Sequence, residues 1–113
     1  MNILALLILS AGLAVATPIP DSQANKIADA IYKAEGGTKT KYPYGIVSVK
    51  TTNPRQVCIN TIKNTWTRYQ SSPQTNDFIE FLGNRYCPVG VTNDPRGLNQ
   101  NWVKNVKKFL DIK

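Results

Sequence analysis

Glu35 stands apart from the other carboxylates of the chain. No further Asp or Glu occurs between Asp29 and Asp77, and Glu35 falls where an amphipathic helix is expected to end. Helix C-termini carry exposed carbonyl groups, which disfavour an acidic side chain there by roughly 0.3–1 kcal/mol and raise its pKa, as partial burial also would. A carboxyl group that stays protonated near neutral pH can act as a general acid on a leaving oxygen. The simpler alternative is a solvated glutamate at a frayed helix end.

The residue types present exclude several other kinds of chemistry. The chain contains no histidine, which removes the Ser-His and Cys-His pairs that activate a nucleophile. Two cysteines without histidine do not supply the usual ligands of a zinc site, and no cofactor is expected. In an oxidising compartment Cys58 and Cys87 are expected to form one intrachain disulfide. Closing that loop of about 30 residues would stabilise the fold by roughly 3.5 kcal/mol.

The first residues have the pattern of a secretory signal peptide. Residues 3–9 are continuously apolar, and Ala14-Val15-Ala16 provides a small-x-small cleavage site before Thr17. A membrane anchor is the alternative, but the apolar run covers only about 15 residues, short of the roughly 20 that cross a bilayer. We therefore expect removal of residues 1–16 and a secreted or periplasmic protein. Residues 17–113 would then form one small domain without an integral membrane segment.

The charge of the chain narrows the choice of partners. It contains 14 basic and 7 acidic residues, a net charge of +7, and all of these residues follow position 16. Such a charge favours anionic partners. For an exported protein these are the cell wall, an outer surface or lipid headgroups, and no nucleic acid is expected. Solubility alone is the alternative explanation.

Apolar residues recur at helical spacing in four segments, which predicts a mainly α domain. The expected helices cover about 22–35, 54–70, 77–86 and 99–110. Their expected starts are Asp21 or Ser22, Asn53-Pro54, and Asn76 or Asp77, with Gly36-Gly37 ending the first helix. After that helix, Tyr42-Pro43-Tyr44-Gly45 predicts a turn, and residues 46–49 predict a short extended or β segment.

The apolar faces of these helices define the expected core. Most of the aromatic residues are assigned to it, whereas Lys104, Lys107 and Lys108 of the last helix are expected to point largely outward. The expected core residues are Ile27, Ala28, Ile31, Ala34, Cys58, Ile62, Trp66, Tyr69, Phe78, Ile79, Leu82, Tyr86, Trp102, Val103, Val106 and Phe109.

The segment around Glu35 resembles a motif of known glycosidases. It reads Ala34-Glu35-Gly36-Gly37 and then Tyr42-Pro43-Tyr44-Gly45-Ile46-Val47-Ser48. A helix ending in a catalytic Glu, followed by a turn with a Tyr-Gly-Ile or Gly-Leu-Met element, is the pattern of the lysozyme-like superfamily, which includes soluble lytic transglycosylases. The resemblance implies a small lysozyme-like helical domain. It also implies Glu35 as the catalytic acid and peptidoglycan glycan strands as the substrate.

Departures from the family pattern bear on the mechanism. Pro43 stands where animal-type lysozymes carry an Asp, Gly36 stands where the transglycosylases usually carry a Ser, and the segment between Glu35 and Tyr44 is short. Retaining glycosidases generally need a second carboxylate about 5–5.5 Å from the first. No motif places one of the remaining acids there: Asp77, Glu80, Asp94 or Asp111. A single-carboxylate scheme like that of the lytic transglycosylases fits better, in which one Glu acts as acid and then as base to give a 1,6-anhydro sugar. Hydrolysis, as in goose-type lysozymes, is the close alternative.

The resemblance also implies residues that bind substrate. Tyr42 and Tyr44 could stack on a sugar ring or hydrogen bond near Glu35, and the Gly45-Ile46 backbone could contact an N-acetyl group. Ser48 stands near the position of a family Gln that follows the motif in animal-type lysozymes, and Tyr86 corresponds to a later family Tyr, although a core role fits it equally. Independently of the family, Asn60 and Asn64 lie one helical turn apart and could face a polar cleft.

Two other functions stay open. The first is a lysozyme-like module that holds glycan without cutting it, which the absent Asp and Gln would favour. The second is a cationic membrane-active or protein-binding factor whose last helix rests on anionic lipid. In each case we expect a monomer.

Overall fold

The computed structural model describes residues 17–45, 51–73, 75–86 and 100–111. Within these ranges the chain forms α2 (Asp21–Ala34), a short 3₁₀ helix η1 (Gly37–Lys39), α3 (Pro54–Ser71), α4 (Phe78–Tyr86) and α5 (Gln100–Phe109). The mainly α-helical class is confirmed, and each expected helix is found close to its expected ends. The expected signal segment 1–16 and the expected extended segment 46–49 lie outside the described residues.

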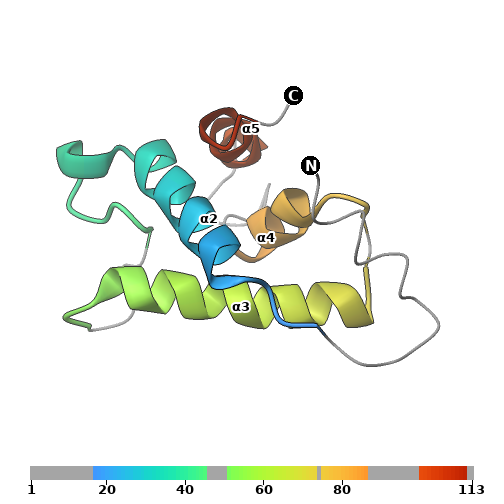
Figure 1. Ribbon diagram of the computed structural model, residues 1–113. Coiled ribbons are helices and arrows are strands. Elements are labelled where there is room, and N and C mark those ends of the chain that lie inside the picture. Colours follow the sequence, from blue (N-terminus) through green and yellow to red (C-terminus); the bar gives the residue numbers. More distant parts are fainter. Residues whose placement is uncertain (1–16, 46–50, 74, 87–99, 112–113) are drawn as a thin grey trace.

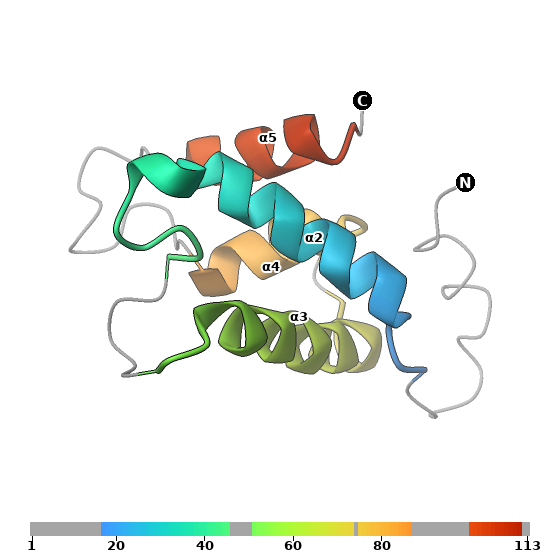
Figure 2. The same ribbon diagram turned by 60° about the vertical axis from the view of Figure 1, so that its left-hand side comes forward.

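The four α-helices are stacked in three tiers. α2 and α4 form the middle tier, and each of them packs against α3 on one side and against α5 on the other. Figure 1 shows α3 as the lowest helix, with α2 crossing above it and α5 above α2; Figure 2 keeps this order after the molecule is turned. Because α2 is covered from two sides, its small and branched residues Ala24, Ile27, Ala28, Ala30 and Ile31 are all buried.

Local sequence explains where α3 and α4 begin. The side chain of Asn53 caps α3 by accepting a hydrogen bond from the Gln56 N–H at 3.1 Å, and Pro54 occupies the first helical position. The Oδ1 atom of Asp77 accepts a hydrogen bond from the Ile79 N–H at 2.9 Å at the start of α4. Both predicted starts are therefore confirmed.

The start of α2 corrects the prediction. Neither Asp21 nor Ser22 is the cap, because α2 already begins at Asp21 and the capping position is Pro20, whose side chain accepts no hydrogen bond. Pro20 has an extended backbone with φ −58° and ψ 141°, a conformation that proline favours. Asp21 instead places a negative charge in the first turn, where the helix dipole favours it, and pairs with Lys63 of α3 at 2.9 Å.

An aromatic cluster fills the space between α3 and α4. The rings of Trp66 and Phe78 meet edge to face with centroids 4.9 Å apart, and the Tyr69 ring contacts both of them. Tyr69 also packs on Phe81 with centroids 5.3 Å apart. Apart from Phe81, which is half-buried, these residues are almost fully buried. The expected core faces of α3 and α4 are therefore confirmed.

One predicted core residue of α5 lies at the surface. Trp102 and Val106 are buried as expected, but Phe109 is 43% exposed. The buried residues of α5 are Trp102 and Val106, four residues apart, and the partly buried Leu110 continues this line just beyond the helix. Phe109 therefore lies at the edge of the buried side. The position of Phe109 at the last turn adds to its exposure because the helix ends there.

Two contacts fix α5 against α4. Gly83 allows the helices to approach closely, because a Cβ atom at that position would lie only 2.6 Å from Cγ2 of Val103. Lys107 forms an ion pair with Asp77, and both side chains are mostly covered. Lys107 is thus engaged with α4, whereas the other two lysines predicted to point outward are exposed.

Thr17, the first described residue, is bound to α3. Its carbonyl accepts hydrogen bonds from Trp66 Nε1 at 2.9 Å and from Gln70 Nε2 at 2.7 Å, and its N–H donates to Gln70 Oε1 at 2.8 Å. Ile19 follows and is buried in the core. Among the helices in the described ranges, none combines the length and the apolar character needed to cross a membrane.

Candidate functional site

Glu35 lies at the end of α2, where two glycines turn the chain. Its backbone N–H donates to the Ile31 carbonyl at 2.9 Å, which completes the last turn of the helix. Gly36 follows with φ +106°, in the left-handed region that L-residues rarely adopt. The predicted end of the helix is confirmed, and the Glu35 side chain is half-buried.

The turn at Tyr42–Gly45 brings a glycine against the Glu35 side chain. The Gly45 N–H donates to the Tyr42 carbonyl at 2.9 Å, so the predicted turn is present, and Gly45 has φ +69°. A Cβ atom at Gly45 would lie 2.5 Å from Oε2 and 3.5 Å from Cδ of Glu35. The carboxyl group therefore occupies the space that any larger residue would fill.

Tyr86 approaches the same space from the end of α4. A Cβ atom at Gly45 would lie 3.9 Å from Cδ1 of Tyr86. The Tyr86 ring stacks on Trp102 with centroids 5.3 Å apart, and its side chain interacts with the Cys58 thiol of α3. The site is thus assembled from the end of α2, the turn, α3 and α4.

Burial raises the pKa of the Glu35 carboxyl above its usual value of 4.5. No charged neighbour among the described residues contributes to this shift, so desolvation is its cause. Burial was one of the two causes considered from the sequence, and it is the one found. A carboxyl group with a raised pKa beside an exposed glycine backbone can donate a proton to an oxygen atom held there.

Cys58 lies within electrostatic range of Glu35. It is a free, fully buried thiol in the structure. Burial raises the pKa of the Cys58 thiol to about 11, the charge of Glu35 adds to the rise, and the Tyr86 hydroxyl and the Arg55 charge oppose it. Cys87 lies outside the described residues, so the disulfide between the two cysteines stays a prediction.

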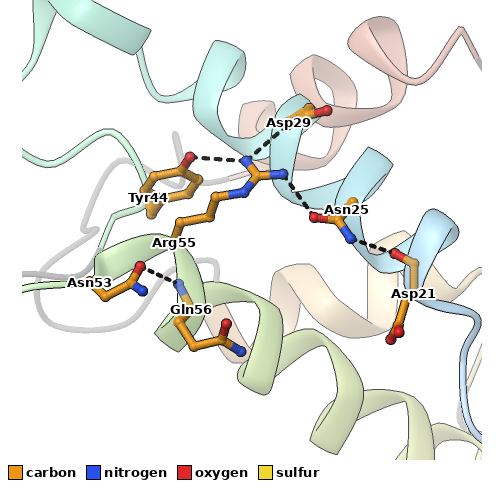
Figure 3. A network of polar contacts seen from close by, with 7 residues as sticks. All are labelled: Asp21, Asn25, Asp29, Tyr44, Asn53, Arg55 and Gln56. Atoms are coloured by element: carbon orange, nitrogen blue, oxygen red, sulfur yellow. Dashed lines mark hydrogen bonds and ion pairs between the residues drawn. The ribbon is translucent and has the colours of Figure 1, made fainter.

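Arg55 ties the turn to α2 and α3 in the network that Figure 3 shows. Its Nη1 atom donates to the Tyr44 hydroxyl at 3.1 Å and pairs with Asp29 Oδ1 at 2.8 Å, and its Nη2 atom donates to Asn25 Oδ1 at 3.1 Å. The Tyr44 ring also lies 5.4 Å from that of Tyr32. These contacts explain why Tyr44 is only 9% exposed.

An open pocket of about 260 Å³ lies beside this network. It contains two cationic side chains, one carboxylate and two aromatic rings, from Asp29, Tyr32, Lys33, Tyr44 and Arg55. Tyr44 belongs both to this pocket and to the turn that contacts Glu35. The pocket is therefore a neighbour of the carboxyl group rather than a cavity around it.

No protein-family model, curated protein or solved structure matches this chain. Its function therefore has to be argued from the chemistry of the site. In the ranges that the structure describes, His, Cys, Asp and Glu side chains form no group of three or more that could hold a metal ion.

The structure brings part of the predicted site together. Glu35, Gly45 and Tyr86 share one space, and Tyr44 lies next to it with its hydroxyl turned to Arg55. Tyr42 is at the surface and 42% exposed. Ile46 and Ser48 lie outside the described residues.

Asn60 and Asn64 are not brought to Glu35. Both are exposed, and helical geometry puts them on the side of α3 that faces away from the buried Cys58. Asn60 instead accepts a hydrogen bond from Gln56 Nε2 at 2.9 Å along the solvent face of the helix. The shared face that the sequence predicted exists, but it does not line the site.

Of the pocket residues, only Tyr44 was predicted from the sequence to have a role, as a substrate-binding residue. No role was predicted for Asp29, Tyr32, Lys33 or Arg55. One signal was available, because Asp29 and Lys33 lie four residues apart on the exposed side of α2, with the half-buried Tyr32 beside Lys33. The start of α3, with Arg55, packs against these residues of α2, and this contact depends on tertiary packing.

Proposed function

We propose that this protein cleaves the glycan strands of peptidoglycan, as a lytic transglycosylase or muramidase of the lysozyme-like superfamily, with Glu35 as its single general acid and base. The observation that carries the proposal is the contact between the Glu35 carboxyl group and Gly45. Glu35 and the Tyr44-Gly45-Ile46 element are the two halves of the motif that suggested a glycosidase. For the motif to function as in a glycosidase, these two parts have to lie close together in space.

In the proposed reaction the protonated Glu35 donates its proton to the glycosidic oxygen as the bond between that oxygen and C1 breaks. The sugar left behind has the character of an oxocarbenium ion, which the substrate's own N-acetyl group stabilises. Glu35, now a carboxylate, removes the proton from the 6-hydroxyl of that sugar, and the hydroxyl oxygen bonds to C1. The product is a 1,6-anhydro sugar, and Glu35 is protonated again. In the hydrolytic alternative a water molecule replaces the 6-hydroxyl.

The electrostatics of Glu35 support a scheme with one carboxylate. In a retaining glycosidase a second carboxylate lies about 5–5.5 Å away, and its charge would raise the pKa of the acid further. Burial is the cause of the raised Glu35 pKa, with no contribution from another carboxylate in the described residues. Asp77, one of the remaining acids, is paired with Lys107 of α5.

Other features support the proposed substrate and location. The exposed Tyr42 can stack on a sugar ring, and the Gly45 backbone beside the carboxyl group is open to an N-acetyl group. The charge of +7 suits the anionic cell wall. Cleavage before Thr17 would leave a mature N-terminus that keeps its hydrogen bonds to α3, which supports a secreted or periplasmic protein.

A binding module that does not cut glycan is the second candidate. It is favoured by the position of the pocket, which lies beside the acid and not over it. Pro43 also stands where animal-type lysozymes have an Asp. In this case Glu35 would hold a sugar by a hydrogen bond without transferring its proton.

Release of soluble fragments from purified peptidoglycan tests the proposal. The oxidised protein of residues 17–113 is compared with its Glu35→Gln variant, in which the side chain keeps its shape but loses the acidic proton. Glu80→Gln is the matched control, because Glu80 is an exposed carboxylate on α4. We expect release by the parent protein and by the control only. Activity in Glu35→Gln would contradict the assignment of the acid, and saturable binding without release by any form would favour the binding module.

A further inference from the structure

The geometry points to a second binding function for this molecule: the pocket formed by Asp29, Tyr32, Lys33, Tyr44 and Arg55 is a subsite for a carboxylate-bearing substituent of the glycan substrate. This inference rests on the proposed function, since it names the part of the substrate that lies next to the sugar at Glu35. The carboxylate could belong to a sugar's lactyl group or to an attached peptide. Both present the same chemistry to the pocket.

Two residues adjacent in sequence place the pocket next to Glu35. Gly45 contacts the carboxyl group of Glu35, and Tyr44 forms part of the pocket wall. Tyr32 and Lys33, also in the wall, lie in the last turns of α2, which ends next to Glu35. A substituent on a sugar held at Glu35 can therefore reach the pocket along the end of α2.

Arg55 is prepared to bind an anion. A guanidinium has five N–H donors, and three of those on Arg55 are directed to Tyr44, Asp29 and Asn25. Among the residues that the structure describes, Nε and the second hydrogen of Nη2 have no partner. The three existing contacts hold the guanidinium in one orientation, so little side-chain entropy is lost when a carboxylate binds to the remaining donors.

The charge of the pocket favours an anion although it contains a carboxylate. Arg55 and Lys33 contribute two positive charges and Asp29 one negative charge, which leaves a positive excess. Lys33 is exposed and has no ion-pair partner among the described residues. The Asp29 side chain is 59% exposed, and such surface pairs are weak, typically about 0–1 kcal/mol. Asp29 therefore orients Arg55 without neutralising the pocket.

The size and walls of the pocket suit part of a polymer rather than a cofactor. Its volume of about 260 Å³ is below that of pockets that hold drug-sized ligands, roughly 300–1,000 Å³. The rings of Tyr32 and Tyr44 supply an aromatic wall for a sugar ring or an aliphatic chain. An aromatic wall beside fixed cations fits a sugar or peptide residue that carries a carboxylate.

The test compares three ligands that differ in their carboxylates. The first is a neutral oligomer of N-acetylglucosamine. The second is glycan freed of peptide, in which each muramic acid has a free lactyl carboxylate, and the third is the same glycan with its peptides attached. Binding to Glu35→Gln protein of residues 17–113 is measured by calorimetry, so that the ligand is not cut. Tighter binding of the second or the third ligand identifies which carboxylate the pocket takes.

Three further substitutions in this background separate the pocket from the general charge of the protein. Arg55→Met removes the fixed guanidinium, and Lys33→Met removes the exposed cation without touching the Tyr44 network. Lys63→Met is the matched control, because Lys63 also lies on α3 and also pairs with a carboxylate of α2, Asp21, away from the pocket. Arg55→Met is expected to weaken binding of the carboxylate-bearing ligand about tenfold or more, and Lys33→Met is expected to weaken it by a smaller factor. Lys63→Met should have the same small effect on the carboxylate-bearing ligand as on the neutral one.

The outcomes are distinguishable. A preference for a carboxylate-bearing ligand that Arg55→Met and Lys33→Met remove, and Lys63→Met keeps, supports the subsite. If all three ligands bind equally, or if all three substitutions act alike, the subsite is wrong while the proposed cleavage of glycan stands. If no glycan binds and none is cut, both the proposed function and this inference are wrong.

Discussion

The Glu35 carboxyl group occupies the space that a side chain at position 45 would fill, so Gly45 is the residue that allows this contact. The proposed function depends on the pair. An alanine at position 45 would have to adopt φ +69°, which costs roughly 1–2 kcal/mol for an L-residue. Its Cβ would also lie 2.5 Å from Glu35 Oε2, so the carboxyl group would have to move. We therefore expect Gly45→Ala to lower the melting temperature and to abolish release of soluble fragments.

Gly36→Ala is the control for backbone strain. Gly36 also has a positive φ, but of the residues that the structure describes a Cβ there would meet only Thr40, with its nearest atom 3.6 Å away. This variant should lose stability and keep activity. Melting curves and fragment release measured on both variants separate the two effects. Full activity in Gly45→Ala would contradict the role given to this contact.

The raised pKa of Glu35 predicts a pH-dependent difference in stability. Because burial raises the pKa, the folded protein binds more protons at this position than the unfolded chain does. The stability that the bound Glu35 proton contributes is fully present below pH 4.5, the usual pKa of a glutamate, and is lost as the pH rises through the raised pKa of the folded protein. The Glu35→Gln variant does not lose this stability, because a glutamine side chain does not titrate.

The melting temperatures of the two proteins should therefore be similar at about pH 3.5 and diverge in favour of Glu35→Gln towards about pH 8. Thermal unfolding followed by circular dichroism across this range measures the difference. A gap that stays constant over the whole range would mean that the Glu35 pKa is the same in the folded and unfolded states.

At the scale of the elements, the sequence predicted the helices better than it predicted what they bring together. Helix bounds depend on nearby residues, and the Asn53-Pro54 start and the Gly36 end were found from them. The predicted cap of α2 was wrong, because Asp21 or Ser22 was expected at the position that Pro20 occupies. The Arg55–Asp29 contact was missed because it depends on how α3 packs against α2, which no local pattern fixes.

The two parts of the candidate site illustrate the same limit. Glu35 and Gly45 were identified in advance because both belong to one short motif. Asn60 and Asn64 were correctly predicted to share a helix face, but periodicity alone did not indicate that the face would point to solvent. The assignment of Phe109 to the core was wrong for a related reason, since a residue at the edge of a helix's apolar face can lie on the buried or on the exposed side.

Asp77 combines two roles between α4 and α5, and these can be separated. Its Oδ1 atom caps α4, and its Oδ2 atom pairs with Lys107 of α5. Asp77→Ala removes both, and the loss of the cap alone typically costs about 1 kcal/mol. Asp77→Asn keeps an acceptor for the cap and removes the charge. Urea denaturation should give a clearly larger loss for Asp77→Ala, and an equal loss in the two variants would mean that the cap contributes nothing.

For the molecule as a whole, the predicted disulfide would join the middle of the chain to the end of α4. Tyr86 precedes Cys87 in sequence, and its side chain interacts with the Cys58 thiol. The end of α4 therefore lies near the thiol, and a disulfide would add a covalent link there. Such a link matters most in a small domain with a limited core.

We expect the protein purified from an oxidising compartment to contain no titratable thiol after unfolding. Reduction should lower the free energy of unfolding by roughly 3.5 kcal/mol, or the melting temperature by about 15 °C. Thiol titration in denaturant and melting curves with and without reductant measure both quantities. Two free thiols in the oxidised preparation would contradict the predicted bond. In the reduced folded protein, the Cys58 pKa of about 11 predicts very slow alkylation of that residue.

We propose that one carboxyl group, Glu35, cleaves glycan strands as acid and then as base. Mass spectrometry of purified peptidoglycan digested with the oxidised protein of residues 17–113 and with Glu35→Gln tests it most directly. We expect soluble fragments that end in 1,6-anhydro sugars with the parent protein and none with the variant. Reducing ends would replace the transglycosylase scheme by hydrolysis, and equal product from the variant, or no product from either protein, would contradict the claim.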